Sequence, residues 1–429
     1  MRIALFEDHR VTQLYPATIG KPAYAISCGS YRLLDLVRGL GDSVLAWVRP
    51  HLSEFREAEP PPSLSPGGKA SPGQTAYVNA RLVPSAEIIE ALRKLFASGR
   101  EGFLAASEEF RPEADRGQPP SLADVACAVL PAGAPPPPPS AGPEELSRWW
   151  SALKLAAFDG PKLPLFDYPH DIIRHHLKIL AKNLEHRLAA GDHREAAEGV
   201  FLAEGALLGQ HVVTDTRNGP IVIDERASIG PHGFLSGPVH IGAGARVIEQ
   251  AAIKDGVALG HTTKVGGEVE GSIIEPYTNK QHHGFLGHSY LGSWINLGAG
   301  TCNSDLKNTY GPVNMEYHGR KTPTGMQFVG CIAGDYAKSA INTGIFTGKT
   351  IGACSMIYGF VTTNVPSFTN YARLFGQVTE APVEIMVATQ ARMFARRNVE
   401  QRPCDVQLLH DMYELTRHER QIAGEPLSL

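Results

Sequence analysis

Histidines and asparagines with potential chemical roles lie close together in the 429-residue sequence, between residues 261 and 303. A neutral imidazole can accept a proton near neutral pH, and three imidazoles with one open position can hold a zinc ion that generates hydroxide. Carboxamides can bind polar groups of a substrate without adding charge. The stretch therefore predicts either proton transfer on a polar substrate or activation of a metal-bound water. The residues concerned are His261, His282, His283, His288, Asn296 and Asn303.

A strict six-residue spacing of aliphatic residues indicates the scaffold that must position these side chains. The eight residues are Ile223, Ile229, Leu235, Ile241, Val247, Ile253, Leu259 and Val265. A small or β-branched residue stands two positions before almost every one of them, as in Ala227 and Ala245. An amphipathic helix would need apolar residues three and four apart. The pattern is instead typical of a hexapeptide β-helix repeat.

In such a repeat, three hexads close one triangular coil, and the aliphatic side chains stack in an internal column. The family built this way coils left-handed, against the usual preference for right-handed crossovers. After Val265 the period slips by three residues before Leu286, and it resumes at Leu291, Leu297 and Ile345. The reactive stretch lies at this break, so the break predicts the position of the site.

The segment Gly284 to Asn303, GFLGHSYLGSWINLGAGTCN, resembles the acetyltransferase domain of the bifunctional UDP-N-acetylglucosamine pyrophosphorylase/glucosamine-1-phosphate N-acetyltransferases. In that family a catalytic histidine stands fourteen residues before the asparagine of an N-[IL]-G-A-G-T motif, which corresponds here to His282 and Asn296. The runs NKQHHGFLGHSY and NSDLKNTYG more closely resemble its divergent bacterial branch. The resemblance also aligns Phe285 with a sugar-contacting tyrosine, Asn303 with a second asparagine and Lys307 with a loop lysine.

This resemblance implies acetyl transfer from acetyl-CoA to an amino-sugar phosphate, with glucosamine 1-phosphate as the first choice, in a homotrimer. His282 would take the proton of the substrate ammonium. Backbone amides of Gly298, Ala299 and Gly300 would bind the tetrahedral oxyanion. Asn296 and Asn303 would bind sugar hydroxyls or the acetamido group. The predicted phosphate ligands are Lys264, Lys280 and Lys307.

Two other functions remain open for the repeat domain. His261, His283 and His288 resemble the three-histidine zinc pattern of the γ-class carbonic anhydrases. Neighbouring residues on a strand face opposite sides, so His282 and His283 cannot both face one site, and the zinc hypothesis leaves the asparagines unexplained. The third possibility is a noncatalytic trimeric scaffold that binds a sugar nucleotide.

The amino-terminal part resembles a sugar nucleotidyltransferase only in part. The stretch from Leu14 to Gly29 resembles the later half of that family's fingerprint, but FEDHR at residues 6–10 replaces its glycine-rich phosphate loop. Residues 78–84 resemble the strand that ends in a metal-binding aspartate in that family, but they offer Asn79 and Arg81 instead. Uridylyl transfer and degenerate sugar-nucleotide binding both remain open, with Asp8 or Asp35 as substitute ligands for Mg²⁺. The predicted phosphate ligands are Arg10, Lys21 and Arg32.

Three domains are expected. Residues 1–197 should form an α/β, Rossmann-like nucleotidyltransferase domain with proline-rich insertions at 60–72 and 131–143, ending in a helix over 171–190. His175, His176 and His186 on that helix are predicted to face solvent. Residues 198–379 should form the left-handed β-helix, and residues 380–429 a helical tail.

The composition of the chain limits the classes of binding partner that can be expected. A net charge of −4 without basic runs gives no electrostatic case for nucleic acid or an anionic membrane. The six cysteines are scattered, without a CxxC pair, which favours reduced thiols in a cytoplasm. The sequence begins MRIALFEDHR, which does not fit a signal peptide, and no stretch reaches membrane-spanning length. The expected partners are small sugar phosphates or sugar nucleotides.

Overall fold

The computed structural model describes residues 1–54, 74–107, 121–131, 133–138, 141–158 and 160–422. The predicted insertion at residues 60–72 lies outside the described residues. Contacts divide the chain into two units, one of residues 1–26 and 31–168, the other of residues 27–30 and 169–429. The predicted boundary at residue 197 therefore remains a prediction.

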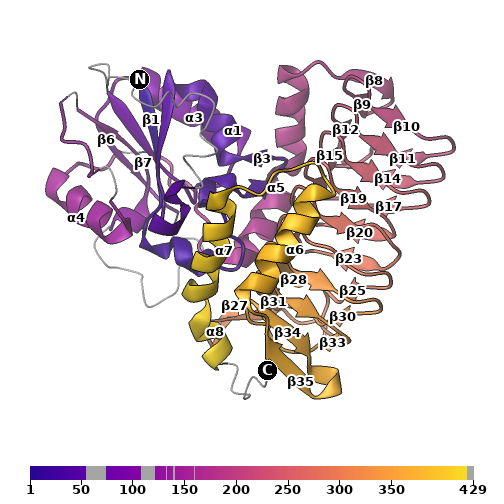
Figure 1. The fold of residues 1–429 in the computed structure, drawn as a ribbon. Helices are drawn as coiled ribbons and strands as arrows, with labels where there is room; N and C mark the ends of the chain where they lie inside the picture. Colours follow the sequence, from indigo (N-terminus) through magenta and orange to yellow (C-terminus); the bar gives the residue numbers. More distant parts are fainter. Residues whose placement is uncertain (55–73, 108–120, 132, 139–140, 159, 423–429) are drawn as a thin grey trace. The chain divides into compact units, whose positions relative to one another are not determined.

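The first unit is an α/β domain around a mixed five-stranded sheet of order β4-β1-β5-β7-β6 (Figure 1). β1, β4 and β5 are parallel, whereas β7 runs antiparallel to β5 and β6. The α/β expectation is confirmed, because strands of this sheet alternate with the helices α1, α3 and α4 along the chain. The bounds are β1 (Arg2–Phe6), β4 (Ser43–Trp47), β5 (Thr75–Asn79), β6 (Gly102–Ala105), β7 (Val125–Leu130), α1 (Leu33–Val37), α3 (Ala86–Ala97) and α4 (Pro143–Leu153).

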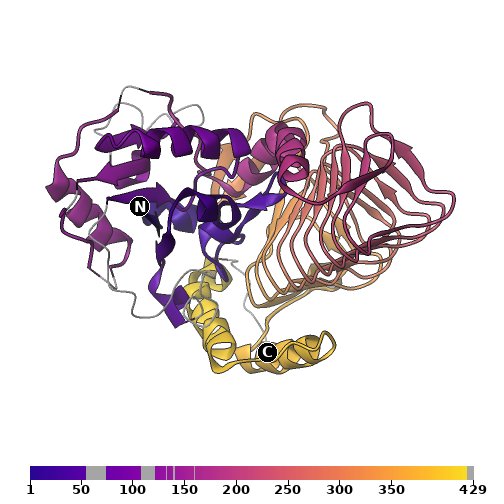
Figure 2. The same ribbon diagram turned by 90° about the horizontal axis from the view of Figure 1, so that it is seen from above.

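The second unit is a left-handed parallel β-helix, in which each coil contributes one strand to each of three faces (Figures 1 and 2). The first face contains β8 (Arg194–Ala197), β9 (Val200–Leu202), β12 (Ile221–Ile223), β15 (Val239–Ile241), β18 (Val257–Leu259), β21 (Ile273–Ile274), β24 (Tyr290–Leu291), β28 (Cys331–Ala333) and β31 (Lys349–Ile351). The second face contains β10 (Leu207–Leu208), β13 (Ser228–Ile229), β16 (Arg246–Val247), β19 (Lys264–Val265), β22 (Asn279–Lys280), β29 (Lys338–Ser339), β32 (Met356–Ile357), β34 (Thr369–Ala372) and β35 (Gln377–Glu380). The third face contains β11 (Val213–Asp215), β14 (Phe234–Ser236), β17 (Ala252–Ile253), β20 (Glu268–Glu270), β23 (Phe285–Gly287), β25 (Cys302–Asn303), β30 (Gly344–Ile345) and β33 (Phe360–Val361).

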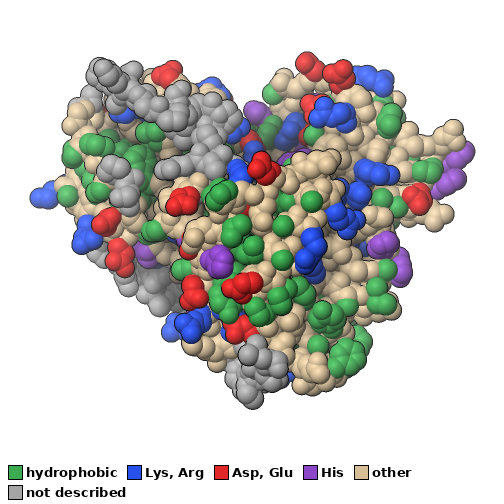
Figure 3. All heavy atoms as spheres, viewed as in Figure 1, with side chains coloured by type: hydrophobic (Ala, Val, Ile, Leu, Met, Phe, Trp, Pro, Cys, Tyr) green, Lys and Arg blue, Asp and Glu red, His purple; other side chains and the backbone are tan. Residues whose placement is uncertain are grey.

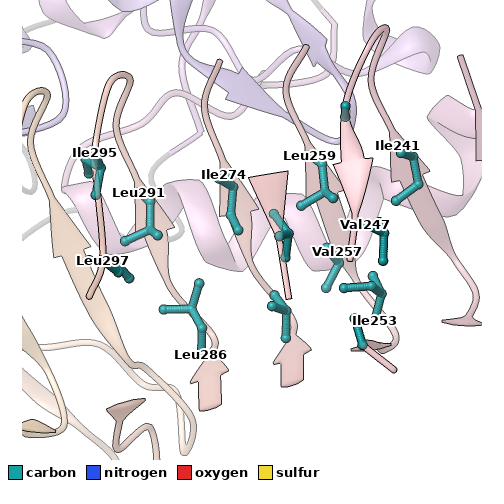
Figure 4. Packing of buried hydrophobic residues seen from close by; sticks show 14 of the residues in the cluster. Ile241, Val247, Ile253, Val257, Leu259, Ile274, Leu286, Leu291, Ile295 and Leu297 are labelled. Carbon is teal, nitrogen blue, oxygen red and sulfur yellow. The ribbon is translucent and has the colours of Figure 1, made fainter. Parts of the chain in front are cut away.

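The hexad aliphatics form one continuous internal column (Figure 4). Ile241, Val247 and Ile253 come from three successive faces, and each is at most 3% exposed. Because the strands of these coils pair in parallel with the strands one coil away, the side chain that faces inward keeps its place from coil to coil. The predicted inward column is thus confirmed.

The slip in the period has a simple structural cause. The corner between β19 and β20 contains only Gly266 and Gly267, whereas the corners between β16 and β17 and between β22 and β23 each contain four residues. A second shortening follows between Val269 and Ile274, which are five residues apart and both belong to the column. Together these changes remove three residues from the coil and place Lys280 opposite Val265.

Helix α5 (Pro169–Ala190) packs on the first face of the β-helix through Leu180 and Leu184, which contact Val222 and Ala258. His175 and His176 are buried, so their predicted exposure is wrong. His176 is buried because its Nδ1 accepts the Gly29 amide at 2.9 Å and its Nε2 lies 2.9 Å from the Gly256 carbonyl oxygen. Burial lowers the pKa of His176 to about 4, which keeps the ring neutral.

The predicted helical tail forms α6 (Val383–Ala395), α7 (Pro403–Leu415) and α8 (Arg417–Ile422). The excursion between β25 and β28 contains a hairpin of β26 (Asn314–Tyr317) and β27 (Arg320–Pro323). Within the described part of the chain, no helix is both long and apolar enough to cross a membrane.

Candidate functional site

A cleft of about 590 Å³ lies on the second face of the β-helix, against the carboxyl end of α6. It brings together five residues that the sequence singled out. They are Lys264, His282, Asn296, Gly298 and Ala299. The tail adds Met393, Arg396 and Arg397, which sequence reasoning missed.

Parallel pairing explains why polar side chains from distant segments meet in this cleft. Lys264 pairs with Asn279, Asn279 with Asn296, and Asn296 with Lys338, one coil apart each time. Because the next residue in each strand points into the column, these four side chains point outward together. The second face therefore presents one polar row to the cleft.

His282 lies on the corner of residues 281–284, between the second and third faces, and its side chain is exposed into the cleft. His283 is equally exposed on the same corner but does not line the cleft. The two histidines thus have separate environments, but they lie on a corner and not on a strand, so the strand alternation expected from the sequence is not the cause. In the described residues no polar side chain holds the His282 ring, which leaves its nitrogens available to a substrate.

Only one of the three amides predicted to bind an oxyanion is available. The amide of Gly298 donates to Ser339, and that of Gly300 donates to the His283 carbonyl oxygen at 3.0 Å. The Ala299 amide has no hydrogen-bond acceptor among the described residues. Ala299 is thus the best-placed amide for a developing oxyanion in this cleft.

The cleft carries a large excess of positive charge. Lys264, Lys338, Arg396 and Arg397 line it, and none of its lining residues in the described chain is acidic. Burial, and then the charges of Arg397 and Arg246, lowers the pKa of Lys264 below its ordinary value. Burial also lowers the pKa of Lys338 to about 8. Such crowded cations favour a ligand with several negative charges. Figure 3 shows Lys and Arg side chains in blue on this part of the surface.

Aromatic stacking holds α6 at the edge of the cleft. The Trp294 ring lies parallel to Tyr277 on the preceding coil, with centroids 4.2 Å apart, and its centroid lies 4.5 Å from that of Phe394 on α6. Arg397 also donates to Asn279 Oδ1 at 2.7 Å. These contacts place the carboxyl end of α6, and with it two arginines, over the second face.

The remaining predicted ligands of the repeat domain lie outside the cleft. Asn303 is buried, and its carboxamide accepts the Gly287 amide at 2.8 Å and donates to the Gly287 carbonyl oxygen at 3.0 Å. Lys307 donates to the Pro312 carbonyl oxygen at 2.8 Å. Phe285 lies on the third face beside Gly287. Lys280 points into the prism, where its side chain is 2% exposed.

The three histidines of the zinc hypothesis do not converge within the chain. His261 lies on the corner between the first and second faces, His283 on the next corner, and His288 on the third. His288 Nδ1 lies 2.8 Å from Asp305 Oδ2. Among the described residues, no group of three or more His, Cys, Asp or Glu side chains is arranged to hold a metal ion.

The carboxyl end of β1 carries buried ion pairs in the first unit. Glu7 accepts from Arg49 Nε at 3.0 Å, and Asp8 accepts from Arg81 Nη2 at 2.9 Å. Arg81 also donates to Asp167 at 2.9 Å. These carboxylates already have cationic partners, so they do not fit a Mg²⁺ site.

The other predicted ligands in the first unit also have partners. Arg32 forms a two-bond pair with Asp35, at 3.0 and 2.7 Å. Arg10 lies 3.9 Å from Asp124. The Lys21 carbonyl oxygen accepts from Arg49 at 2.9 Å. The side chains of Asp8, Asp35, Arg10 and Arg32 are thus tied to neighbouring groups of the protein, whereas the bond from Arg49 involves only the backbone of Lys21.

Comparisons with known proteins match both parts of this architecture. Residues 3–190 match the model of a family described as sugar nucleotidyl transferase. The bifunctional protein GlmU of Methanococcus vannielii is 32% identical over 109 residues, which cover 25% of this chain and 26% of that protein. The bifunctional sugar-1-phosphate nucleotidylyltransferase/acetyltransferase of Sulfurisphaera tokodaii is 28% identical over 142 residues, 33% and 35% of the two chains.

The match to these curated relatives spans only about a quarter to a third of their length. Among solved structures, the UDP-N-acetylglucosamine acyltransferase of Francisella novicida is similar with a TM-score of 0.34 at 15% identity, over 54% of this chain and 79% of that one. Residues 3–190 therefore match the sugar nucleotidyl transferase family model, and part of the chain is similar to the bifunctional sugar-1-phosphate nucleotidyltransferase/acetyltransferase proteins.

Proposed function

We propose that the chain is an acetyl-CoA-dependent N-acetyltransferase that acts on an amino-sugar phosphate, with glucosamine 1-phosphate as the preferred acceptor. The observation that carries the proposal is the cleft of the second face. It combines an accessible imidazole, a free backbone amide, a carboxamide and four cations. The names of the relatives support the same chemistry.

In the proposed reaction, His282 takes a proton from the substrate ammonium, and the resulting amine attacks the thioester carbonyl carbon. The Ala299 amide donates to the oxyanion of the tetrahedral intermediate. The C–S bond then breaks, the imidazolium returns its proton to the leaving thiolate, and the attacking nitrogen loses its second proton to water, so that the amide, the thiol and one proton are released. Asn296 binds a polar group of the acceptor. The phosphate groups of the two substrates are bound by Lys264, Lys338, Arg396 and Arg397.

The zinc-dependent hydration and scaffold hypotheses account less well for this cleft, because neither requires a free amide beside an accessible imidazole. Uridylyl transfer is not part of the proposal. Glu7 and Asp8 already pair with arginines where a metal would have to bind.

Replacing Arg396 by glutamine should test the phosphate assignment. We expect the KM for acetyl-CoA to rise about tenfold, with kcat within about twofold, because one charged hydrogen bond to the ligand is lost. The measurement is thiol release with acetyl-CoA and glucosamine 1-phosphate. Arg392→Gln is the matched control, because Arg392 is on the same helix but does not line the cleft. An equal effect of both substitutions would contradict the assignment, and no thiol release by the wild type with this acceptor would contradict the proposed function.

We also propose a homotrimer. Apolar side chains are exposed on this prism, with Ile341 68%, Phe346 50% and Phe360 53% exposed, and Ile341 also lines the cleft. Figure 3 shows apolar side chains in green over β30 and β33. A neighbouring prism would cover these side chains. Light scattering should give three times the mass of one chain, and a monomeric mass would refute the trimer.

A further inference from the structure

Lys280 occupies a position that is aliphatic in the preceding coils. On the second face, the inward residues before it are Ile229, Val247 and Val265, and Lys280 pairs with Val265. Its side chain is 2% exposed. A buried ammonium is costly unless its donors are satisfied. A lysine in an aliphatic column therefore needs a specific reason.

All three N–H donors of this ammonium have acceptors. The distances from Lys280 Nζ are 2.7 Å to the Gly266 carbonyl oxygen, 3.0 Å to that of His282 and 2.6 Å to that of Gly284. No donor is left for a phosphate group. The predicted role of Lys280 as a phosphate ligand therefore does not fit its position.

The shortened corner at Gly266 and Gly267 explains why the Gly266 and His282 carbonyl groups need a donor, whereas the Gly284 carbonyl oxygen also accepts the Glu268 amide at 3.1 Å. At full-length corners of this edge, a backbone amide bonds to the neighbouring coil, as from Gln250 to the Pro231 carbonyl oxygen at 3.0 Å and from Asn342 to that of Ala299 at 2.7 Å. In the described chain, neither the His282 nor the His283 amide makes such a bond to the shortened coil. The Lys280 ammonium instead links the two coils by bonding to both corners.

We propose that Lys280 is a positioning residue for His282: its ammonium bridges the shortened corner and holds the corner of residues 281–284 so that the imidazole stays in the cleft. The catalytic consequence rests on the function proposed above. That Lys280 orders the corner of residues 281–284 does not depend on this function, and it can be tested in the protein without substrate.

The charge state of Lys280 links this role to pH. Burial lowers the pKa of Lys280 to about 8, although the nearby Cys302 and Glu268 act in the opposite direction. Loss of one proton leaves two N–H donors for three carbonyl oxygens. The pKa of Lys280 is lower in the folded protein than in the unfolded chain, so the unfolded chain binds more protons above about pH 8. The contribution of Lys280 to the free energy of unfolding therefore rises with pH in that window. Activity should fall in the same pH window, because the neutral amine holds the corner less well. A fall in activity while stability rises distinguishes the positioning role from an effect on stability.

Replacement of Lys280 by methionine fills the column without a charge. We expect kcat to fall at least about tenfold, with the KM for acetyl-CoA within about twofold, because the contacts of the donor remain. The decrease in kcat above about pH 8 should be smaller than in the wild type, since the titrating group is gone. Lys254→Met is the control, because that lysine pairs with Glu268 and does not line the cleft. Wild-type kcat with an unchanged pH profile would overturn the proposal.

Hydrogen exchange of the free protein tests the same proposal without activity. The Gly300 amide donates to the His283 carbonyl oxygen, so its exchange rate reports the order of the corner, and the Asn342 amide serves as reference. We expect the Gly300/Asn342 rate ratio to rise in Lys280→Met, and an unchanged ratio would overturn the proposal even if no acetyl transfer is found.

If Lys280→Met does not fold, the same ratio is measured in the wild type between pH 7 and 9. The reference amide cancels the intrinsic pH dependence of exchange. A rise in the ratio above about pH 8 supports the role of the ammonium, and a constant ratio overturns it.

Discussion

Replacing His282 by alanine is expected to lower kcat for acetyl transfer about 10²- to 10⁴-fold, which is the usual contribution of a positioned general base. The ammonium form of the acceptor has no electron pair for attack on the thioester, so its proton must leave first. His282 is the only histidine that lines the cleft in the described chain. Thiol release at saturating acetyl-CoA and acceptor measures the effect.

His283→Ala is the matched control for this prediction. It removes an equally exposed imidazole from the same corner, but one that does not line the cleft. We expect its kcat to stay within about threefold of the wild type, since no proton transfer is lost. Retained activity in His282→Ala would refute the base assignment. Loss of activity in both variants would indicate damage to the corner rather than loss of a base.

The β-helix was predictable because its physical signal is local and repeated. Each hexad places one aliphatic residue inward, so Ile223 to Val265 reveal the column without knowledge of any distant contact. The slip after Val265 was visible too, but its cause was not. A corner reduced to Gly266 and Gly267 and a lysine that takes an aliphatic position become recognisable only when the strands are paired.

The site was predictable only where its residues belong to the repeat. His282, Asn296 and Ala299 meet because parallel pairing keeps register along the second face. Arg396 and Arg397 lie about a hundred residues further along the chain, and the contact of Phe394 with Trp294 decides where they go. Asn303 and Lys307 suited ligand binding by residue type, but their polar atoms bond to the backbone.

In the first unit, the α/β architecture could be predicted from the sequence, yet the chemistry at the strand ends depends on partners far away in the sequence. Glu7 pairs with Arg49, and Asp8 pairs with Arg81, 73 residues later. In the sequence alone, the charged residues of FEDHR at positions 6–10 suggested metal or phosphate ligands. In the folded protein, the ion pairs of Glu7 and Asp8 form a buried polar network. This network ties the end of β1 to the segments that directly follow β4 and β5. The charges of this network are thus paired with one another inside the first unit.

Arg81→Met should therefore destabilise the first unit by about 3–5 kcal/mol, because it leaves Asp8 and Asp167 without their cationic partner in a buried site. Urea unfolding followed by tryptophan fluorescence measures the change, since Trp47, Trp149 and Trp150 belong to this unit. Arg32→Met is the control. Its pair with Asp35 is partly exposed, and we expect a loss below about 1 kcal/mol.

Equal unfolding curves for the wild type and Arg81→Met would show that the buried pair is not required for the fold. The carboxylates would then be free to serve a ligand, because Asp8 would tolerate the loss of its guanidinium partner. In that case Mg²⁺ should bind the variant and raise its unfolding midpoint by mass action. A large loss of stability that Mg²⁺ does not reverse is the result we expect, because Asp8 and Asp167 are arranged around the guanidinium group of Arg81.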